Sequence, residues 1–202
     1  MTRHVLHDSC GWPLIPLGGG SWIHALPVTV YHLERCIWSA GVGGLDPEVV
    51  LPPARPHPED VAVSEVPRLW ACRVTAVQAT DIALWLGGRL PTRTEWLAAE
   101  RLWLDAGALR AALQPGTEGD DRIGRLIAVL QRDSAPVHNR LLPPGFGEYA
   151  SEYGRGRGAM FIMSSTAPEG MVTLGSEVTY RSDDVSFRCV FDAACAPSAA
   201  ET

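Results

Sequence analysis

The sequence has little positive charge, and its cysteines do not follow a metal-binding or redox pattern. There are 17 Lys and Arg against 23 Asp and Glu, so the formal net charge is −6. This balance argues against nucleic acid as the main partner. The five cysteines are scattered without a C-x-x-C spacing, which argues against a zinc knuckle or a thioredoxin-type pair. We expect most of them to be small buried side chains, kept reduced in a cytoplasm.

Long hydrophobic runs are also missing. Gly, Pro or charged residues interrupt every apolar stretch before it approaches the ~20 residues of a membrane-spanning helix. Residues 1–20 contain no basic patch followed by an apolar stretch, so we expect no signal peptide. These absences predict a protein without a membrane span and a cytoplasmic location.

The composition is typical of one globular domain. The chain has 202 residues, of which 46 % are hydrophobic and 20 % are charged, enough to build a core without a disulfide or metal. We expect a single domain over residues 1–192. Residues 193–202 are small and are predicted to form a flexible tail.

Helical patterns are concentrated in the middle of the chain. Apolar residues at helical spacing predict helices over residues 79–86, about 93–104 and about 120–132. Thr92 and Glu95 have the spacing of a capping box, in which each side chain satisfies a free amide of the first turn. The helix over residues 93–104 is therefore the most strongly indicated element.

Short apolar–polar alternation predicts β-strands, mostly in the last third of the chain. The predicted strands cover residues 23–30, 159–163, 171–174, 178–180 and 187–191. Proline and glycine predict loops over residues 11–20 and 47–58. The expected fold class is α+β, with short twisted strands, a few helices and much irregular loop.

One segment resembles a known family. Residues 85–96 read W-L-G-G-R-L-P-T-R-T-E-W and residues 98–101 read A-A-E-R. This motif resembles the signature of the formylglycine-generating enzyme (sulfatase-modifying factor) family. Weaker similarities follow in the family's order at residues 147–153, 157–161 and 185–190. The resemblance covers roughly residues 74–190 and implies a C-type lectin-like fold.

The shared residues are mainly architectural. The resemblance implies core positions for three aromatic side chains, Trp85, Trp96 and Phe187. Arg89 and Arg188 are expected to form structural ion pairs with Glu95 or Glu152.

The family's catalytic metal site is where the sequence departs from the resemblance. Family members bind copper through two cysteines, but residues 162–185 contain none, and copper(I) without thiolate ligands is chemically implausible. Related non-haem iron sulfoxide synthases bind metal through histidines of a separate helical domain, which this chain lacks. We therefore expect no cofactor and no catalysis. The alternative is a metal-dependent oxidoreductase related to these enzymes, with a rearranged site.

The expected function is that of a ligand-binding or protein-binding module. In C-type lectin-like folds a rigid core displays irregular loops, and such loops commonly carry recognition. Here the segment of residues 164–184 is rich in polar side chains. The predicted ligand-binding residues are Ser164, Thr166, Ser176, Thr179, Tyr180, Arg181 and Asp183. If the loop binds calcium, Asp183 and Asp184 beside Ser182 are the expected ligands.

The expected partner is a protein or a surface ligand bound through these loops. The resemblance extends to the diversified recognition proteins of diversity-generating retroelements and to phage receptor-binding or virion proteins, which reuse this fold. A phage-encoded chain would be located in the virion. A further alternative is a subunit of a larger assembly.

Overall fold

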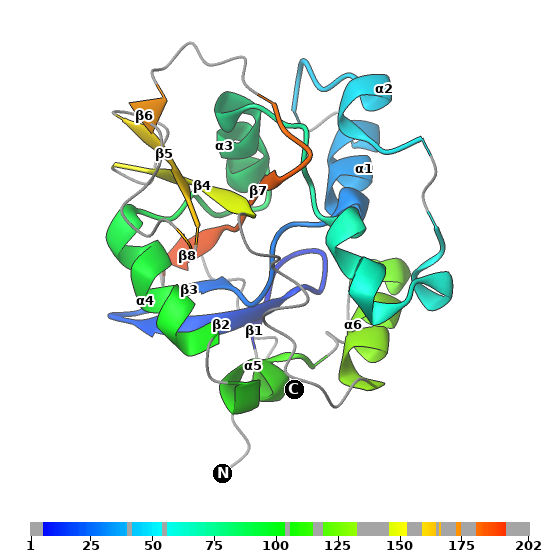
Figure 1. The fold of residues 1–202 in the computed structure, drawn as a ribbon, viewed down its shortest axis with the longest axis horizontal. Helices are drawn as coiled ribbons and strands as arrows, with labels where there is room; N and C mark the ends of the chain where they lie inside the picture. The colour runs from blue at the N-terminus through cyan, green and yellow to red at the C-terminus, as the bar shows by residue number, and fades with distance from the viewer. Residues whose placement is uncertain are drawn as a thin grey trace.

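The computed structural model describes residues 6–39, 42–53, 56–103, 106–114, 119–132, 146–152, 159–164, 166, 173–174 and 181–192. These residues form a mixed α+β fold with two four-stranded sheets (Figure 1). The predicted α+β class is confirmed at this level. Within the described residues, no helix is both long enough and apolar enough to cross a membrane.

The first sheet combines the beginning of the chain with its last described strand. Its order is β1 (Leu6–His7), β2 (Pro13–Gly18), β3 (Ser21–His24) and β8 (Val190–Asp192), and all neighbours are antiparallel. The predicted loop over residues 11–20 is therefore wrong for β2. The strand tolerates its prolines because Pro13 is its first residue and Pro16 borders an irregularity in register.

The second sheet comes from the last third of the chain. Its order is β6 (Thr173–Leu174), β5 (Met160–Met163), β4 (Gly147–Ser151) and β7 (Val185–Phe187). Strands β4 and β7 run parallel, and the other pairs are antiparallel.

The strands predicted over residues 159–163 and 171–174 are both confirmed in part, by β5 and β6, and residues 171–172 lie outside the described residues. The strand predicted over residues 187–191 is instead two strands, β7 and β8, because the chain leaves one sheet at Arg188 and enters the other at Val190. The strand predicted over residues 178–180 lies outside the described residues.

The three predicted helices are present as α3 (Ala76–Trp85), α4 (Arg93–Trp103) and α6 (Asp121–Arg132). Helix α3 begins earlier than predicted because Thr75 and Gln78 form a capping box. The described helices also include α1 (Val30–Trp38), α2 (Pro47–Val50), α5 (Ala106–Ala112), and the 3₁₀ helices η1 (Pro58–Asp60) and η2 (Val63–Leu69).

Two of these additional helices replace predicted elements. The strand predicted over residues 23–30 ends at His24, and helix α1 begins at Val30 behind the N-cap Thr29. The loop predicted over residues 47–58 contains α2, whose N-cap Asp46 accepts a hydrogen bond from the Glu48 amide, with Pro47 in the first turn.

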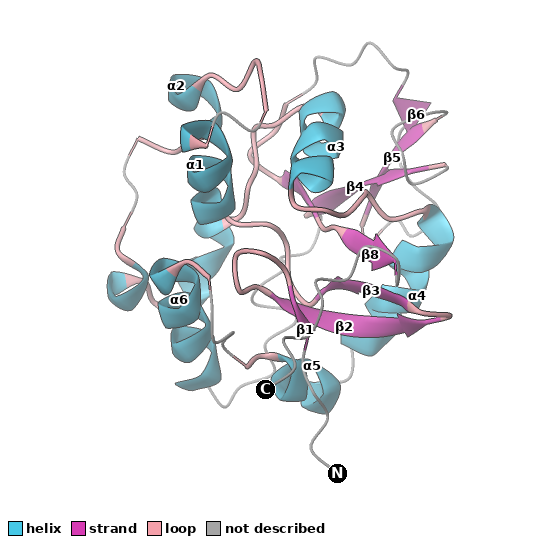
Figure 2. Ribbon diagram, turned by 180° about the vertical axis from the view of Figure 1, so that it is seen from behind, coloured by secondary structure: helices cyan, strands magenta, loops and turns pink. Residues whose placement is uncertain are grey.

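The helices and sheets occupy different sides of the molecule. Helices α1, α2 and α6 lie on one side, whereas both sheets and α4 lie on the other (Figures 1 and 2). Helix α6 buries its apolar face, as predicted, through Ile123, Leu126, Ile127 and Leu130. One continuous core joins the two sides, and its large fully buried side chains include Trp12, Trp70, Tyr31, Tyr149, Phe187 and Phe191.

Candidate functional site

The described part of the predicted recognition segment converges at one end of the second sheet. Ser164 directly follows β5, and Asp183 lies just before β7. Met163 pairs with Glu148 and Val185 pairs with Gly147, so both segments reach the same end of the sheet, on either side of β4.

The predicted residues differ in their exposure at this end of the sheet. Thr166, Arg181 and Asp183 are exposed. Ser164 is fully buried, and its hydroxyl lies 3.1 Å from that of Thr166, so it supports the local turn rather than facing solvent. Ser176, Thr179 and Tyr180 lie outside the described residues.

A pocket of about 780 Å³ borders this end of the sheet, and Asp183 is part of its wall. The other walls come from the proline-rich segment after α2, from η1 and η2, and from residues 70–73. Much of the lining is apolar and is contributed by Val30, Val50, Pro52, Pro56, Val61, Pro67 and Trp70. Sequence reasoning missed the pocket because its walls come from segments that are far apart along the chain.

The lining also includes charged side chains. Four of them form two ion pairs, and the fifth is a carboxylate. Arg68 lies 3.1 Å from Glu65, and the Arg73 Nε atom lies 3.3 Å from an Asp183 carboxylate oxygen. Asp60 also lines the pocket and has no ion-pair partner among the residues that the structure describes. Among the described residues, the lining therefore carries three carboxylates and two guanidinium groups.

Arg73 occupies the pocket wall in an uncommon backbone conformation. Its φ is 62°, the one positive φ among the described residues other than glycine. A left-handed conformation costs a residue with a Cβ roughly 1–2 kcal/mol. The Arg73 amide donates a hydrogen bond of 2.9 Å to the Ser182 carbonyl, which ties this wall to the turn that carries Asp183. Such strain concentrates at functional sites.

Cys72 is the thiol in the pocket lining. Burial, with a smaller contribution from Asp183 and Asp184, raises the pKa of Cys72 to about 12. The side chain is therefore a neutral thiol at neutral pH and a poor nucleophile.

A second group of polar side chains is completely buried in the first half of the chain. Asp8, His24 and His32, the histidine cluster, are fully buried or nearly so. One carboxylate oxygen of Asp8 accepts hydrogen bonds of 2.8 Å from the amides of Cys10 and Trp12. The other lies 3.0 Å from Nε2 of His24 and 3.3 Å from Nε2 of His32.

A backbone donor determines the tautomer of His24. Its Nδ1 accepts a hydrogen bond of 3.2 Å from the Cys189 amide, so the proton lies on Nε2, which donates to Asp8. Nδ1 of His32 lies 3.2 Å from the Thr29 amide and 2.8 Å from the Thr29 hydroxyl, and its Nε2 forms no hydrogen bond among the described residues. Burial lowers the pKa of His24, despite the opposing hydrogen bond to Asp8, so His24 is neutral at neutral pH.

Ligand atoms of Asp8, Cys10 and His32 lie within 4.8 Å of one another. Two of these groups are already engaged inside the protein. Both Asp8 oxygens accept hydrogen bonds, and Nδ1 of His32 contacts the Thr29 amide and hydroxyl. Burial raises the pKa of Cys10 to about 12, so its side chain is a neutral thiol at neutral pH. These internal contacts support a structural role for the cluster.

Sequence reasoning missed the histidine cluster. Its three members are far apart along the chain and match no ligand spacing. The local signal that was available is the Asx turn, in which Asp8 accepts a hydrogen bond from the amide two residues later.

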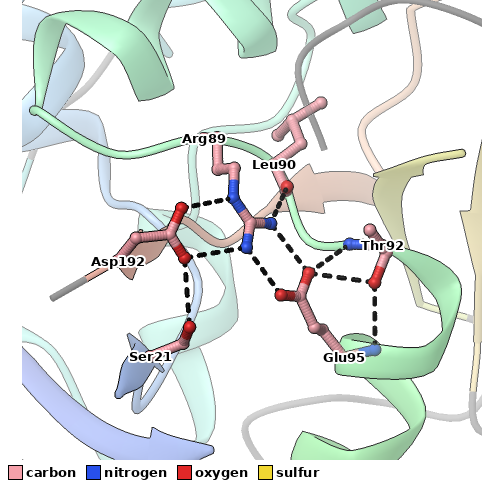
Figure 3. Close-up of polar contacts among 6 residues, drawn as sticks. All are labelled: Ser21, Arg89, Leu90, Thr92, Glu95 and Asp192. Atoms are coloured by element: carbon pink, nitrogen blue, oxygen red, sulfur yellow. Dashed lines mark hydrogen bonds and ion pairs between the residues drawn. The ribbon is translucent and has the colours of Figure 1, made fainter. Parts of the chain in front are cut away.

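The ion pair expected between Arg89 and Glu95 is present (Figure 3). Both guanidinium NH₂ groups of Arg89 contact the Glu95 carboxylate, at 2.8 and 2.6 Å. Arg89 also binds Asp192 through two further hydrogen bonds of 3.0 Å. Since Asp192 additionally accepts a hydrogen bond from Ser21, this network joins α4 to the first sheet.

Arg188 pairs with Glu148 and not with Glu152. The Arg188 Nε atom donates a hydrogen bond of 2.7 Å to Glu148, which also accepts one from the Trp96 indole. The side chain of Glu152 instead accepts a hydrogen bond from the Ala159 amide. The core positions expected for Trp96 and Phe187 are confirmed, whereas Trp85 is only partly buried.

The pocket and the adjoining end of the second sheet are thus the candidate binding site. The histidine cluster and the two arginine networks stabilise the fold.

No protein-family model, curated protein or solved structure matches this chain.

Proposed function

We propose that this chain is a non-catalytic binding module on a C-type-lectin-like scaffold of the formylglycine-generating-enzyme type. Its ligand occupies the pocket beside Asp183 and contacts the loops at the adjoining sheet end. The observation that carries this proposal is the pocket of about 780 Å³ whose wall includes Asp183, a residue also predicted from the sequence.

The construction of the pocket supports a binding role. Its volume falls in the range of about 300–1,000 Å³ that is usual for ligand sites. Pro52, Pro56 and Pro67 line it, and proline has a restricted backbone. A wall that is already ordered reduces the entropy lost on binding.

The expected partner is a protein or a surface ligand, as for other recognition proteins with this type of scaffold. The location that fits this role is the cytoplasm, or the virion if the chain is phage-encoded. The same role is compatible with a subunit of a larger assembly. The alternative, a metal-dependent oxidoreductase, has less support. Residues 162–185 lack the cysteine pair that would bind copper, and His24 of the histidine cluster donates its Nε2 proton to Asp8.

The binding role can be tested by ligand-observed NMR with a library of small fragments. The informative pair of variants is Asp183→Ala and Asp184→Ala. Both side chains are exposed in the same turn, but only Asp183 lines the pocket. Fragments that bind the unaltered chain should bind the Asp183→Ala variant about threefold more weakly or worse, a change of the size expected for an exposed charge.

The Asp184→Ala variant should retain the unaltered affinity. Equal effects of the two substitutions, or no binding fragment at all, would contradict the proposed site. Measuring the metal content of the purified protein distinguishes the binding module from the oxidoreductase. Stoichiometric copper or iron after reconstitution would favour the oxidoreductase.

A further inference from the structure

We infer that the pocket binds a protein segment in which an apolar side chain lies next to a basic one. This inference rests on the proposed binding function and specifies the chemistry of the partner. It follows from the distribution of apolar surface and charge in the lining.

The apolar part of the proposed recognition comes from the pocket wall. Val30, Val50, Val61 and Trp70 form its base but expose little surface, whereas Pro52 and Pro67 are partly exposed and Pro56 is exposed. The proline rings therefore supply the apolar surface that a ligand can reach. An aliphatic or aromatic side chain placed there would lose its hydration shell, with a gain of roughly 25 cal/mol per Å² of apolar surface removed from water.

The preference for a basic side chain in the partner comes from a carboxylate in the lining that forms no ion pair with the described residues. Arg68 and Arg73 each already contact a carboxylate, Glu65 and Asp183 respectively. Asp60 is the lining carboxylate without such a partner among the described residues. An anionic ligand would meet three carboxylates and two occupied guanidinium groups, whereas a cation gains an interaction with Asp60. The formal net charge of −6 favours the approach of a cation as well.

The size of the pocket favours a segment of a partner protein over a single amine. Its walls extend from η1 across η2 to the Asp183 turn. A volume of about 780 Å³ exceeds that of any one side chain, so two or three neighbouring side chains of a peptide fit together.

The test is selection of peptides from a phage-displayed random library on the full chain, followed by binding measurements with the synthetic peptides. The test variant is Asp60→Asn, which removes the charge with little change in shape. The matched control is Asp81→Asn, because Asp81 is exposed on α3 and does not line this pocket. Fluorescence anisotropy supplies the dissociation constants at low and high salt.

Recovered peptides should contain Lys or Arg within a few positions of Leu, Phe or Trp. Asp60→Asn should weaken their binding about fivefold, as expected for one charge-assisted contact, and Asp81→Asn should leave it unchanged. Replacing the basic residue of the peptide by Gln should cause a similar loss, and the loss should not grow further with Asp60→Asn.

Other outcomes would overturn the inference. Selected peptides that lack basic residues, or an Asp60→Asn variant that binds equally well, would assign different chemistry to the pocket. Failure to select peptides, combined with fragments whose binding depends on Asp183, would exclude a peptide partner while leaving the binding role intact. If the fragments also fail to bind, the proposed function itself is wrong.

Discussion

At the scale of single residues, Asp8 shows how backbone amides and histidines can stabilise a buried carboxylate. Two backbone amides and two imidazole Nε2 atoms surround its carboxylate. These contacts outweigh burial and hold the pKa of Asp8 far below its usual range. The cluster joins residues of β3 and α1 to the turn after β1 and to the segment between β7 and β8.

This cluster makes stability depend on pH. The folded chain keeps His24 neutral because burial lowers its pKa, whereas the unfolded chain protonates His24 below about pH 6.5. The unfolded state then binds more protons, so the free energy of unfolding falls as the pH drops below this value. The contribution of Asp8 acts in the same direction, but only at pH values below its ordinary pKa of about 4.

Urea denaturation at pH 7.5 and pH 5.0 measures this dependence. The unaltered chain should be less stable at pH 5.0, with His24 contributing at most about 1.4 kcal/mol per pH unit. The His24→Gln variant should be less stable at pH 7.5 and should show a shallower decrease. An unchanged slope in this variant would show that His24 is not the responsible group.

At the scale of elements, the local signals predicted the helices better than the strands. Helix α4 has its cap in its own sequence, since Thr92 and Glu95 bond each other's backbone amides. The strand β2 depends on neighbours from elsewhere in the chain, and its two prolines gave a loop signal instead. Segment 47–50 likewise forms a short helix within residues 47–58, whose prolines favour a loop.

The junction between α3 and β8 depends on a glycine. A Cβ atom on Gly88 would lie 2.8 Å from the Val190 carbonyl oxygen, which already accepts a hydrogen bond from Arg89. Gly88→Ala should therefore lower the free energy of unfolding by about 1–3 kcal/mol, the usual cost of overpacking.

Gly124 supplies a control in which the Gly→Ala substitution should raise the free energy of unfolding. It lies inside α6, and a Cβ atom there would have open space around it. Gly124→Ala should stabilise the chain by about 0.5–1 kcal/mol because alanine has the higher helix propensity. Urea denaturation measures the free energy of unfolding of both variants. A stabilising effect of Gly88→Ala would contradict the close packing at this junction.

At the scale of the whole molecule, Arg188 connects the two sheets. It lies between β7 and β8, binds Glu148 of β4 and donates a hydrogen bond to the Ala25 carbonyl. Burial lowers the pKa of Arg188 to about 10, so the guanidinium is still charged at neutral pH. The sequence pattern indicated an ion pair for Arg188 but not its partner, because the choice of Glu148 over Glu152 depends on strand topology.

A double-mutant cycle tests this connection. Arg188→Met should destabilise the chain by about 3–5 kcal/mol, because it leaves the Glu148 carboxylate buried without its cation. Adding Glu148→Gln should recover part of this loss, since an amide is cheaper to bury than a charge. Additive effects of the two substitutions in thermal or urea unfolding would show that the pair is not coupled.

The candidate site was predictable only in part, and the reason is again topological. The composition of residues 164–184 predicts a binding role for Asp183, and the structure places Asp183 in the wall of the pocket. Asp60, Arg73 and Trp70 carry no comparable sequence signal, and they become neighbours of Asp183 only because η1, η2 and the Arg73 turn fold against one another. The left-handed backbone of Arg73 could not be anticipated, because arginine has no preference for it.

The pairing of β3 with β8 has a consequence for biosynthesis. Ser21 and its hydrogen-bond partner Asp192 are separated by 171 positions. At a translation rate of roughly 5–20 residues per second, β3 is made about 10–30 seconds before the strand that completes its sheet. During that interval one edge of β3 has no partner and is open to other strands. Until β8 is made, the hairpin of β2 and β3 is therefore the part of this sheet that is exposed to incorrect strand pairing.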